Sequence, residues 1–228
     1  MKMKQILIIA LATFTLGSCL KSSSPAFQAV ANIIFFQEIA VVDEVTSVSY
    51  VPLVQVWGNE AITTCSFTHS SLENFNLSRI TDTYWRSTNP ASKRTDAIPS
   101  GSFTVAATNA NNVTVSSVIT ITTEQEGMSE KLNGELSYTP TTRDLSAKFH
   151  AVAGATGYGI CLMQGEYFLA DEIEVYTAAQ LEAANWTITI TLPAEIDNYA
   201  NEYDLATYAV KVGDVPIVQL GQRVTVSK

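Results

Sequence analysis

The residues that could support acid–base, nucleophilic or metal chemistry are few in this 228-residue chain. It has two histidines, His69 and His150, and three cysteines, Cys19, Cys65 and Cys161. Cys65 and His69 lie in a strand-like stretch, which would place them about 13 Å apart, too far to share a metal ion. The chain also has no nucleophile elbow, phosphate-binding loop, dinucleotide fingerprint, zinc-protease motif or EF-hand loop. We therefore predict that it is not an enzyme and holds neither a cofactor nor a metal.

Two other groups of reactive side chains have structural interpretations. The acidic stretch Asp171-Glu172-Ile173-Glu174 would send alternate side chains to opposite faces of a strand. Calcium needs about six to eight oxygens that converge on one point. We therefore interpret this stretch as a solvated edge strand whose like charges discourage pairing. Cys65 and Cys161 lie in different halves of the chain, and separate buried thiols are favoured over a disulfide between the halves.

One segment combines aromatic rings with positive charge. "DTYWRSTNPASKR" (82–94) places Tyr84, Trp85 and Arg86 before a long polar loop. Aromatic faces stack on sugars, and arginine is a frequent interface anchor, so these three residues are the candidate ligand-binding site. The alternative is a core tryptophan beside a solvated loop. Trp57 and Trp186 lie in alternating strands and are assigned to the core.

The third cysteine, Cys19, has a different setting. Lys2 and Lys4 precede an apolar run, 6–16, which is too short to span a bilayer and has the layout of a secretory signal. The run ends in Leu16-Gly17-Ser18-Cys19. That tetrapeptide resembles the lipobox of bacterial lipoproteins.

The resemblance implies that a diacylglycerol is attached to the sulfur of Cys19 and that the chain is cleaved before it. Residues 1–18 would then be a signal peptide, and 19–26 the lipidated cysteine with a short flexible tether. Several acyl chains hold a protein on a membrane more firmly than one chain does. Leu20 stands in place of the aspartate of inner-membrane retention signals, which favours the outer membrane. Attachment to its periplasmic face and to its cell-surface face are both compatible with the sequence.

The remaining chain has the composition of a folded β-protein. The full chain is 46% hydrophobic and 15% charged, with a formal net charge of −9, which disfavours nucleic-acid binding. Strand-like runs recur at the spacing of an all-β sandwich. A short helix is predicted over 178–184, with Thr177 as its N-cap. The predicted strands are 30–36, 48–57, 61–68, 74–80, 101–109, 113–123, 135–140, 144–152, 157–164, 167–176, 185–192, 202–212 and 216–227.

Both halves contain segments that resemble known domains. "LSAKFHAVAGATGYGICL" (145–162) and "NEYDLATYAVKV" (201–212) resemble a fibronectin type III domain. Phe149 stands where that family usually has tryptophan. Tyr203 is the first candidate for the corner tyrosine of the family, and Tyr208 is the second. "PSGSFTVAATNANNVTVSS" (99–117) resembles the late hairpin of an Ig-like module. We predict two tandem β-sandwiches: an Ig-like domain at 27–124, a linker at 125–131 and a fibronectin type III-like domain at 132–228.

These features together favour a non-catalytic outer-membrane lipoprotein that acts as a protein–protein interaction, adhesion or assembly module of the cell envelope. The alternative is a glycan-binding accessory lipoprotein of a polysaccharide-uptake system. The expected partners are the membrane, through the lipid on Cys19, and an envelope protein or a glycan. Nucleic acid is not expected as a partner.

Overall fold

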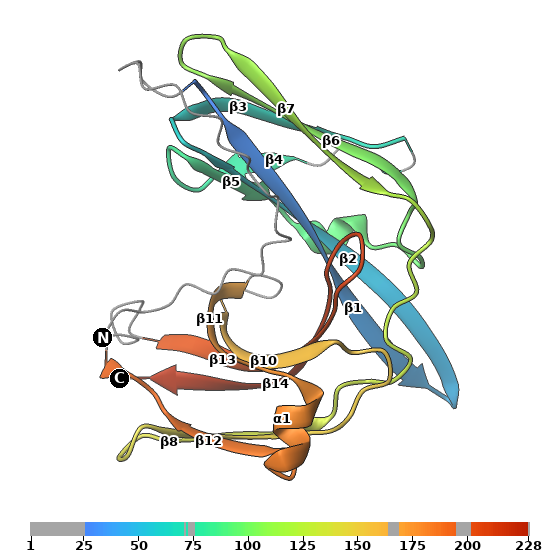
Figure 1. Ribbon diagram of the computed structural model, residues 1–228, viewed down its shortest axis with the longest axis vertical. Coiled ribbons are helices and arrows are strands. Elements are labelled where there is room, and N and C mark those ends of the chain that lie inside the picture. The colour runs from blue at the N-terminus through green and yellow to red at the C-terminus, as the bar shows by residue number, and fades with distance from the viewer. Residues whose placement is uncertain (1–25, 71, 73–75, 164–168, 195–201, 228) are drawn as a thin grey trace.

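The computed structural model describes residues 26–70, 72, 76–163, 169–194 and 202–227. Within them the regular secondary structure is almost entirely β-strand, which confirms the all-β class (Figure 1). The predicted signal peptide, Cys19 and all of the tether before Ala26 lie outside the described residues. In the described ranges, no helix is long and apolar enough to cross a bilayer.

Seven strands of the first half form a sandwich of two sheets. The four-stranded layer has the order β4-β5-β2-β1, and the layer opposite has the order β3-β6-β7. In chain order this is the A-B-E-D and C-F-G arrangement of a constant-type immunoglobulin domain. The strands are β1 (Ala29–Val42), β2 (Val45–Gly58), β3 (Ile62–Thr68), β4 (Leu77–Arg79), β5 (Tyr84–Ser87), β6 (Gly101–Asn109) and β7 (Thr114–Ile121), with the 3-10 helix η1 (Pro90–Lys93) after β5.

The second half forms another seven-stranded sandwich. Its layers have the orders β12-β9-β8 and β11-β10-β13-β14. The first, second and fifth strands therefore face the other four, as in a fibronectin type III domain. The strands are β8 (Gly134–Thr139), β9 (Asp144–Phe149), β10 (Gly157–Met163), β11 (Leu169–Tyr176), β12 (Thr187–Thr191), β13 (Glu202–Lys211) and β14 (Ile217–Ser227).

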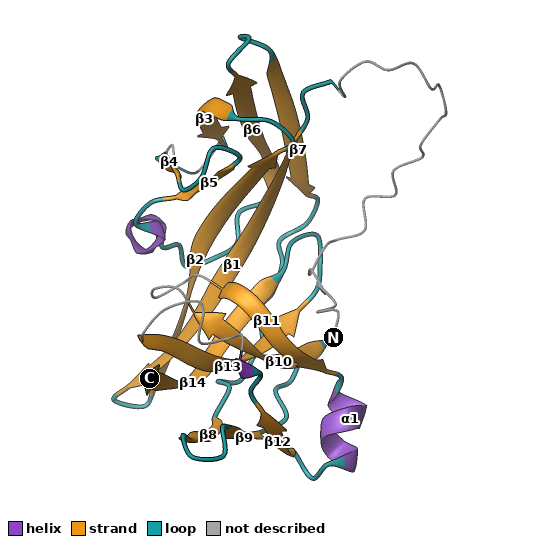
Figure 2. Cartoon of the chain, turned by 90° about the vertical axis from the view of Figure 1, so that its left-hand side faces the viewer, coloured by secondary structure: helices purple, strands orange, loops and turns teal. Residues whose placement is uncertain are grey.

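The predicted helix is α1 (Ala178–Ala183), and it crosses one end of the second sandwich between β11 and β12 (Figure 2). Thr177 is its N-cap, as predicted. The Thr177 hydroxyl accepts the N–H of Gln180 at 3.3 Å, and the Gln180 amide oxygen accepts the N–H of Thr177 at 2.8 Å. This reciprocal pair satisfies donors that the first turn of a helix leaves unpaired.

The two sandwiches share one eight-stranded sheet, which the sequence does not predict. β1 runs parallel to β14, with Phe35 opposite Ile217 and Phe36 opposite Val218. The N–H of Phe35 donates to the carbonyl of Pro216 at 3.0 Å. Phe35 and Ile217 belong to one buried cluster, and Phe36 and Val218 to another. Both three-stranded sheets therefore cover the same face of the large sheet.

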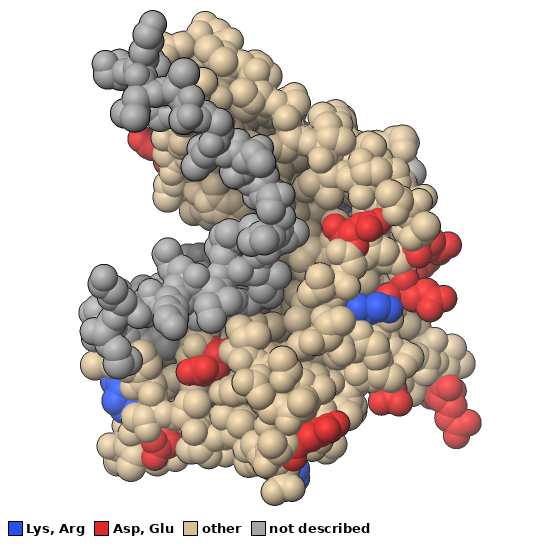
Figure 3. All heavy atoms as spheres, in the orientation of Figure 1, with Lys and Arg blue, Asp and Glu red and all other residues tan. Residues whose placement is uncertain are grey.

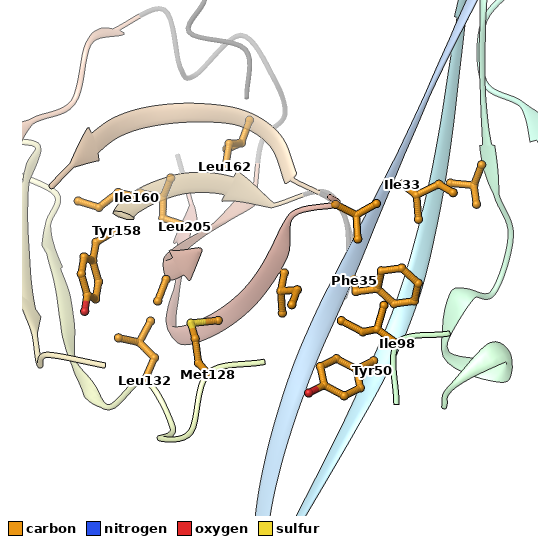
Figure 4. Close-up of a cluster of buried hydrophobic side chains, with 14 of the residues drawn as sticks. Ile33, Phe35, Tyr50, Ile98, Met128, Leu132, Tyr158, Ile160, Leu162 and Leu205 are labelled. Atoms are coloured by element: carbon orange, nitrogen blue, oxygen red, sulfur yellow. The ribbon is translucent and has the colours of Figure 1, made fainter. Parts of the chain in front are cut away.

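The segment predicted as a linker is fixed against this sheet. Met128 and Leu132 lie between the buried side chains of β1–β2 and those of the second sandwich (Figure 4). The side chain of Gln37, on β1, donates to the carbonyl of Met128 at 2.7 Å and accepts its N–H at 2.8 Å. Gly127 approaches so closely that a Cβ there would lie 2.6 Å from both the Gln37 amide nitrogen and the Tyr50 hydroxyl.

A second glutamine repeats this arrangement in the other sandwich. Gln219, on β14, donates from its amide to the carbonyl of Glu130 at 3.1 Å, and its amide oxygen accepts the N–H of Leu132. The ammonium of Lys211 donates to the carbonyl of Glu126 at 2.7 Å. Buried amides that pair with backbone groups replace the hydrogen bonds of a regular strand. The connection therefore holds the two sandwiches together.

Strand β2 keeps its pairing with β1 through Pro52. The register is unbroken, so Leu53 lies in a buried cluster on the face opposite to Tyr50. Proline is tolerated in β2 because position 52 directs its missing N–H away from β1, where β5 does not reach. Strand β5 was not among the predicted strands, and it contains Tyr84, Trp85 and Arg86.

The residues that resemble the fibronectin motif lie in the second core. Phe149 is 1% exposed and packs edge-on against Tyr158, with ring centroids 6.0 Å apart. The Tyr158 hydroxyl accepts the N–H of Val152 at 2.8 Å and so closes the corner before β10. Tyr203 is buried at the start of β13, but residues 195–201 before it lie outside the described residues. Its assignment as the corner tyrosine stays a prediction.

Candidate functional site

The two histidines have structural environments in different sandwiches. His69 stacks on Phe103 with ring centroids 4.1 Å apart, and its Nδ1 accepts the N–H of Leu72 at 3.3 Å. Nδ1 of His150 lies 3.0 Å from the carbonyl oxygen of Asn133. Among the residues that the structure describes, no group of three or more His, Cys, Asp or Glu side chains could hold a metal ion.

The cysteines of the two sandwiches are separate thiols, as predicted. Cys161 is fully buried, and its thiol lies 3.5 Å from the carbonyl of Ala206. Cys65 is half-buried, and burial raises the pKa of its thiol to about 11, against the lowering effect of a backbone hydrogen bond. A thiol with a raised pKa is a poor nucleophile at neutral pH. Neither cysteine has the surroundings of a catalytic residue.

Strand β5 divides the predicted ligand-binding residues between two faces. Trp85 pairs with Val56 and packs against the first core, and its indole N–H donates to the carbonyl of Ile62 at 3.3 Å. Tyr84 and Arg86 point to the opposite face, because successive residues of a strand alternate. The prediction that Tyr84, Trp85 and Arg86 form one surface is therefore wrong, and Trp85 supports the core.

The tryptophan that lies beside Tyr84 is Trp57 and not Trp85. It lies opposite Tyr84 in the β2–β5 ladder, and the rings stack with centroids 5.3 Å apart and planes 17° apart. Trp57 is 38% exposed, so its assignment to the core is wrong. Val54 and Val56 point into the sandwich, and the alternation of β2 turns Trp57 outward. Trp186, in contrast, packs edge-on against the buried Tyr158.

Two polar side chains accompany this aromatic pair. Gln55 pairs with Arg86 across β2 and β5, one pleat along the same face from Trp57 and Tyr84. The Gln55 amide donates to the Tyr84 hydroxyl at 3.0 Å, which fixes the phenol ring. Burial raises the pKa of Tyr84, although the Gln55 hydrogen bond and the Arg86 charge act in the opposite direction. Tyr84 is therefore a neutral hydroxyl at physiological pH.

Apolar side chains extend the aromatic pair across the end of the large sheet. Val30 of β1 lies opposite Trp57 and is 53% exposed. Ile80 donates its N–H to the carbonyl of Tyr84 at 2.9 Å and is 45% exposed. We call Val30, Trp57, Tyr84 and Ile80 the aromatic row. An exposed apolar group of this kind is typical of a binding surface.

Ala26 and Gln28, at the start of the described residues, lie beside this row. Asn59, in the turn after β2, accepts the N–H of Gln28 at 2.8 Å and donates to the carbonyl of Ala26 at 3.0 Å. These bonds fix the start of the described chain against the end of β2 that carries Trp57. Sequence reasoning missed Trp57, although its odd spacing from Val54 and Val56 was the available signal.

The comparisons with known proteins give distant structural matches alone. No family model and no curated protein matches the chain. A solved tetra-tandem repeat from the extending region of a large adhesion protein is 12% identical, with a TM-score of 0.27 over 87% of this chain and 50% of that one. The chain thus spans half of that structure. The strand order above supports the fold assignment without these matches.

Two further structures are similarly distant. The fibronectin(III)-like modules of Clostridium thermocellum CbhA are 7% identical, with a TM-score of 0.23 over 75% of this chain and 85% of theirs. Cadherin domains 1–5 of protocadherin gamma B2 are 12% identical, with a TM-score of 0.21 over 86% of this chain and 40% of theirs.

Proposed function

We propose that this protein is a lipid-anchored, non-catalytic binding module of the outer membrane that recognises an envelope protein through its aromatic row. The observation that carries the proposal is the row itself, with Trp57 38% exposed between Val30 and Tyr84. Covering the exposed part of one tryptophan releases roughly 2 kcal/mol at about 25 cal/mol per Å². A partner that covers the whole row would gain several times that amount.

The rigidity of the two sandwiches supports this role. The shared sheet and the buried amides of Gln37 and Gln219 hold the row in a fixed position relative to the second sandwich. A preorganised surface loses less conformational entropy when it binds. The acidic body shown in Figure 3, with few Lys and Arg side chains on that face, would select against acidic partners.

The tether would keep the row close to the membrane. From a lipidated Cys19, the residues up to Ala26 extend to at most about 25 Å. Ala26 is bound to Asn59, beside Trp57, so the row would lie on the part of the molecule nearest the anchor. Partners in the same membrane would therefore meet the row first.

Anchoring and binding are tested separately. Labelled fatty acid should be incorporated into the wild-type protein and not into Cys19→Ser, and equal labelling of the two would refute anchoring. For binding, a photo-crosslinking residue at Val30 should give one discrete adduct in the envelope. The same residue at Val118, which is 59% exposed on β7, should not. Identical adduct patterns from both positions would refute the row as the binding surface.

Glycan binding is the second candidate, and the Trp57–Tyr84 stack favours it. Sugars stack on aromatic rings and bond to neighbouring polar groups, and the half-buried side chain of Arg86 lies on the same face, one pleat along the sheet. A glycan array is the direct test. Trp57→Ala should abolish a positive signal and Trp186→Phe should retain it. Equal binding by wild type and Trp57→Ala would contradict this candidate.

A further inference from the structure

The hairpin of β1 and β2 extends beyond the first sandwich as an arm. Its register is unbroken from Ala29 opposite Gly58 to Val42 opposite Val45. The turn residues Asp43 and Glu44 both have left-handed backbones, with φ of 49° and 66°. This combination forms a type I′ turn, whose twist matches that of the flanking strands. Figure 1 shows the arm running away from the other strands of the first sandwich.

The edge of β2 that faces away from β1 has hydrogen-bonding partners between Tyr50 and Trp57 and is open from Ser49 to the turn. β5 covers it from Gln55 to Trp57. Thr95 covers it at Tyr50, where the two residues exchange N–H···O bonds of 2.8 and 2.9 Å. Among the described residues, no ladder partner lies on this side of 45–49.

The direction of the open backbone groups follows from the bond to Thr95. Along an antiparallel strand, the N–H and C=O of alternate residues point to the same side. Since Tyr50 points outward, Val48 and Thr46 do so as well. The open edge therefore offers two donors and two acceptors in one row.

The usual protection of an edge strand is missing from this segment. Natural edges are guarded by charges, prolines, bulges or very short strands. The segment Val45-Thr46-Ser47-Val48-Ser49 has no charge and no proline, and Val45 is 68% exposed. The edges of the large sheet are guarded, because β4 has three residues and β11 carries Asp171, Glu172 and Glu174.

We propose that two copies of this protein associate by antiparallel pairing of residues 45–49, about a two-fold axis at Ser47. Thr46 of each copy then lies opposite Val48 of the other, and the two residues exchange hydrogen bonds. The symmetry repeats this pair, which satisfies every open donor and acceptor of both edges. Val45 of each copy faces Ser49 of the other, and no like charges are opposed within the ladder.

The ends of the segment fit this register. One residue beyond Val45, Glu44 comes opposite Tyr50 of the second copy, where Thr95 already occupies the backbone groups. The ladder therefore ends where both edges end. Arg94, next to Thr95, forms an ion pair with Glu38 of its own chain at 2.8 Å, so the register rests on the backbone groups and not on a charge pair with Glu44.

The contact is small, so association should depend on concentration. Five paired residues on each chain bury far less than the roughly 1,200 Å² of a stable interface. The inference uses neither the aromatic row nor the anchor, so it stands or falls apart from the proposed function.

Disulfide trapping tests the register directly. In the two-fold ladder, Ser47 faces Ser47 of the other copy as a non-hydrogen-bonded pair, with Cα atoms about 4.5 Å apart, within the range of a disulfide. Ser49 is the matched control, since the two copies of this residue would be about 13 Å apart along the strands. Ser47→Cys and Ser49→Cys are made as two separate variants of the full chain, each carrying Cys19→Ser and Cys65→Ala. Diamide is the oxidant.

We expect Ser47→Cys to form the disulfide-linked dimer about tenfold faster than Ser49→Cys. Adding Thr46→Pro should remove this difference, because it deletes an outward N–H while proline is tolerated at a strand edge. Circular dichroism checks that this variant folds. Equal rates for the two cysteines, or a folded Thr46→Pro variant that is trapped as fast as its parent, would overturn the proposal.

Discussion

Replacing Gln37 by leucine should weaken the connection between the two sandwiches more than any surface substitution. Gln37 is 3% exposed, and its amide makes both of its hydrogen bonds to the backbone of Met128, which is itself 2% exposed. Leucine would leave a buried N–H and a buried C=O without these partners. Each such group costs about 1–3 kcal/mol, so the loss before compensation is about 2–6 kcal/mol.

Burial of the leucine side chain offsets part of this loss, by roughly 1 kcal/mol. The expected decrease in the free energy of unfolding is therefore about 1–5 kcal/mol, against the roughly 5–15 kcal/mol that is typical of a domain. Urea unfolding followed by tryptophan fluorescence measures it, because Trp57 and Trp85 report on the first sandwich and Trp186 on the second. Hydrogen exchange should also rise at 126–130.

Gln55→Leu is the matched control. Gln55 is 6% exposed, but its amide donates to the hydroxyl of Tyr84 and not to the backbone. We expect it to lose only about 1 kcal/mol. A Gln37→Leu variant that loses no more than this control, and whose exchange at 126–130 is unchanged, would refute the view that the amide of Gln37 holds the connecting segment.

Contacts at three other residues lead to further predictions. Tyr158→Phe should cost about 1–3 kcal/mol in thermal unfolding, because the N–H of Val152 loses its partner inside the protein. Cys65 has a pKa of about 11 when folded against 9.0 for a free thiol, so native iodoacetamide labelling at pH 8 should be slow. The unfolded chain releases this proton first, so stability should fall between pH 9 and 11, and Cys65→Ala should reduce that fall in urea titrations. Thr177→Ala should destabilise the protein by about 1 kcal/mol, since it removes the N-cap of α1, and the melting temperature should fall accordingly.

Local patterns were sufficient to predict most of the strands and the helix. β6 (Gly101–Asn109) begins and ends where its alternation of Phe103, Val105 and Ala107 predicts, and all three side chains are buried. The N-cap of α1 was found because threonine before an alanine-rich run has a local physical role. Such features depend on residues a few positions apart, which a sequence displays directly.

The candidate site was harder to predict because it depends on which strands become neighbours. Trp57 and Trp85 both lie in strands, yet one is turned outward and the other packs against the core. Alternation gives two faces, and only the position of the second sheet decides which face is covered. The short strand β5 was missed because Tyr84–Ser87 carries arginine and serine and lies among polar residues.

The parallel pairing of β1 with β14 has a consequence for how the chain reaches its final form. Among the described strands, β1 is the first to be synthesised, and its neighbour β14 is the last. Contacts between such distant segments slow folding, because a large loop must close before they form. Until then Phe36 would be exposed on an unpaired edge, which is a starting point for aggregation. Until β14 has formed, this protein should therefore need a chaperone to shield β1.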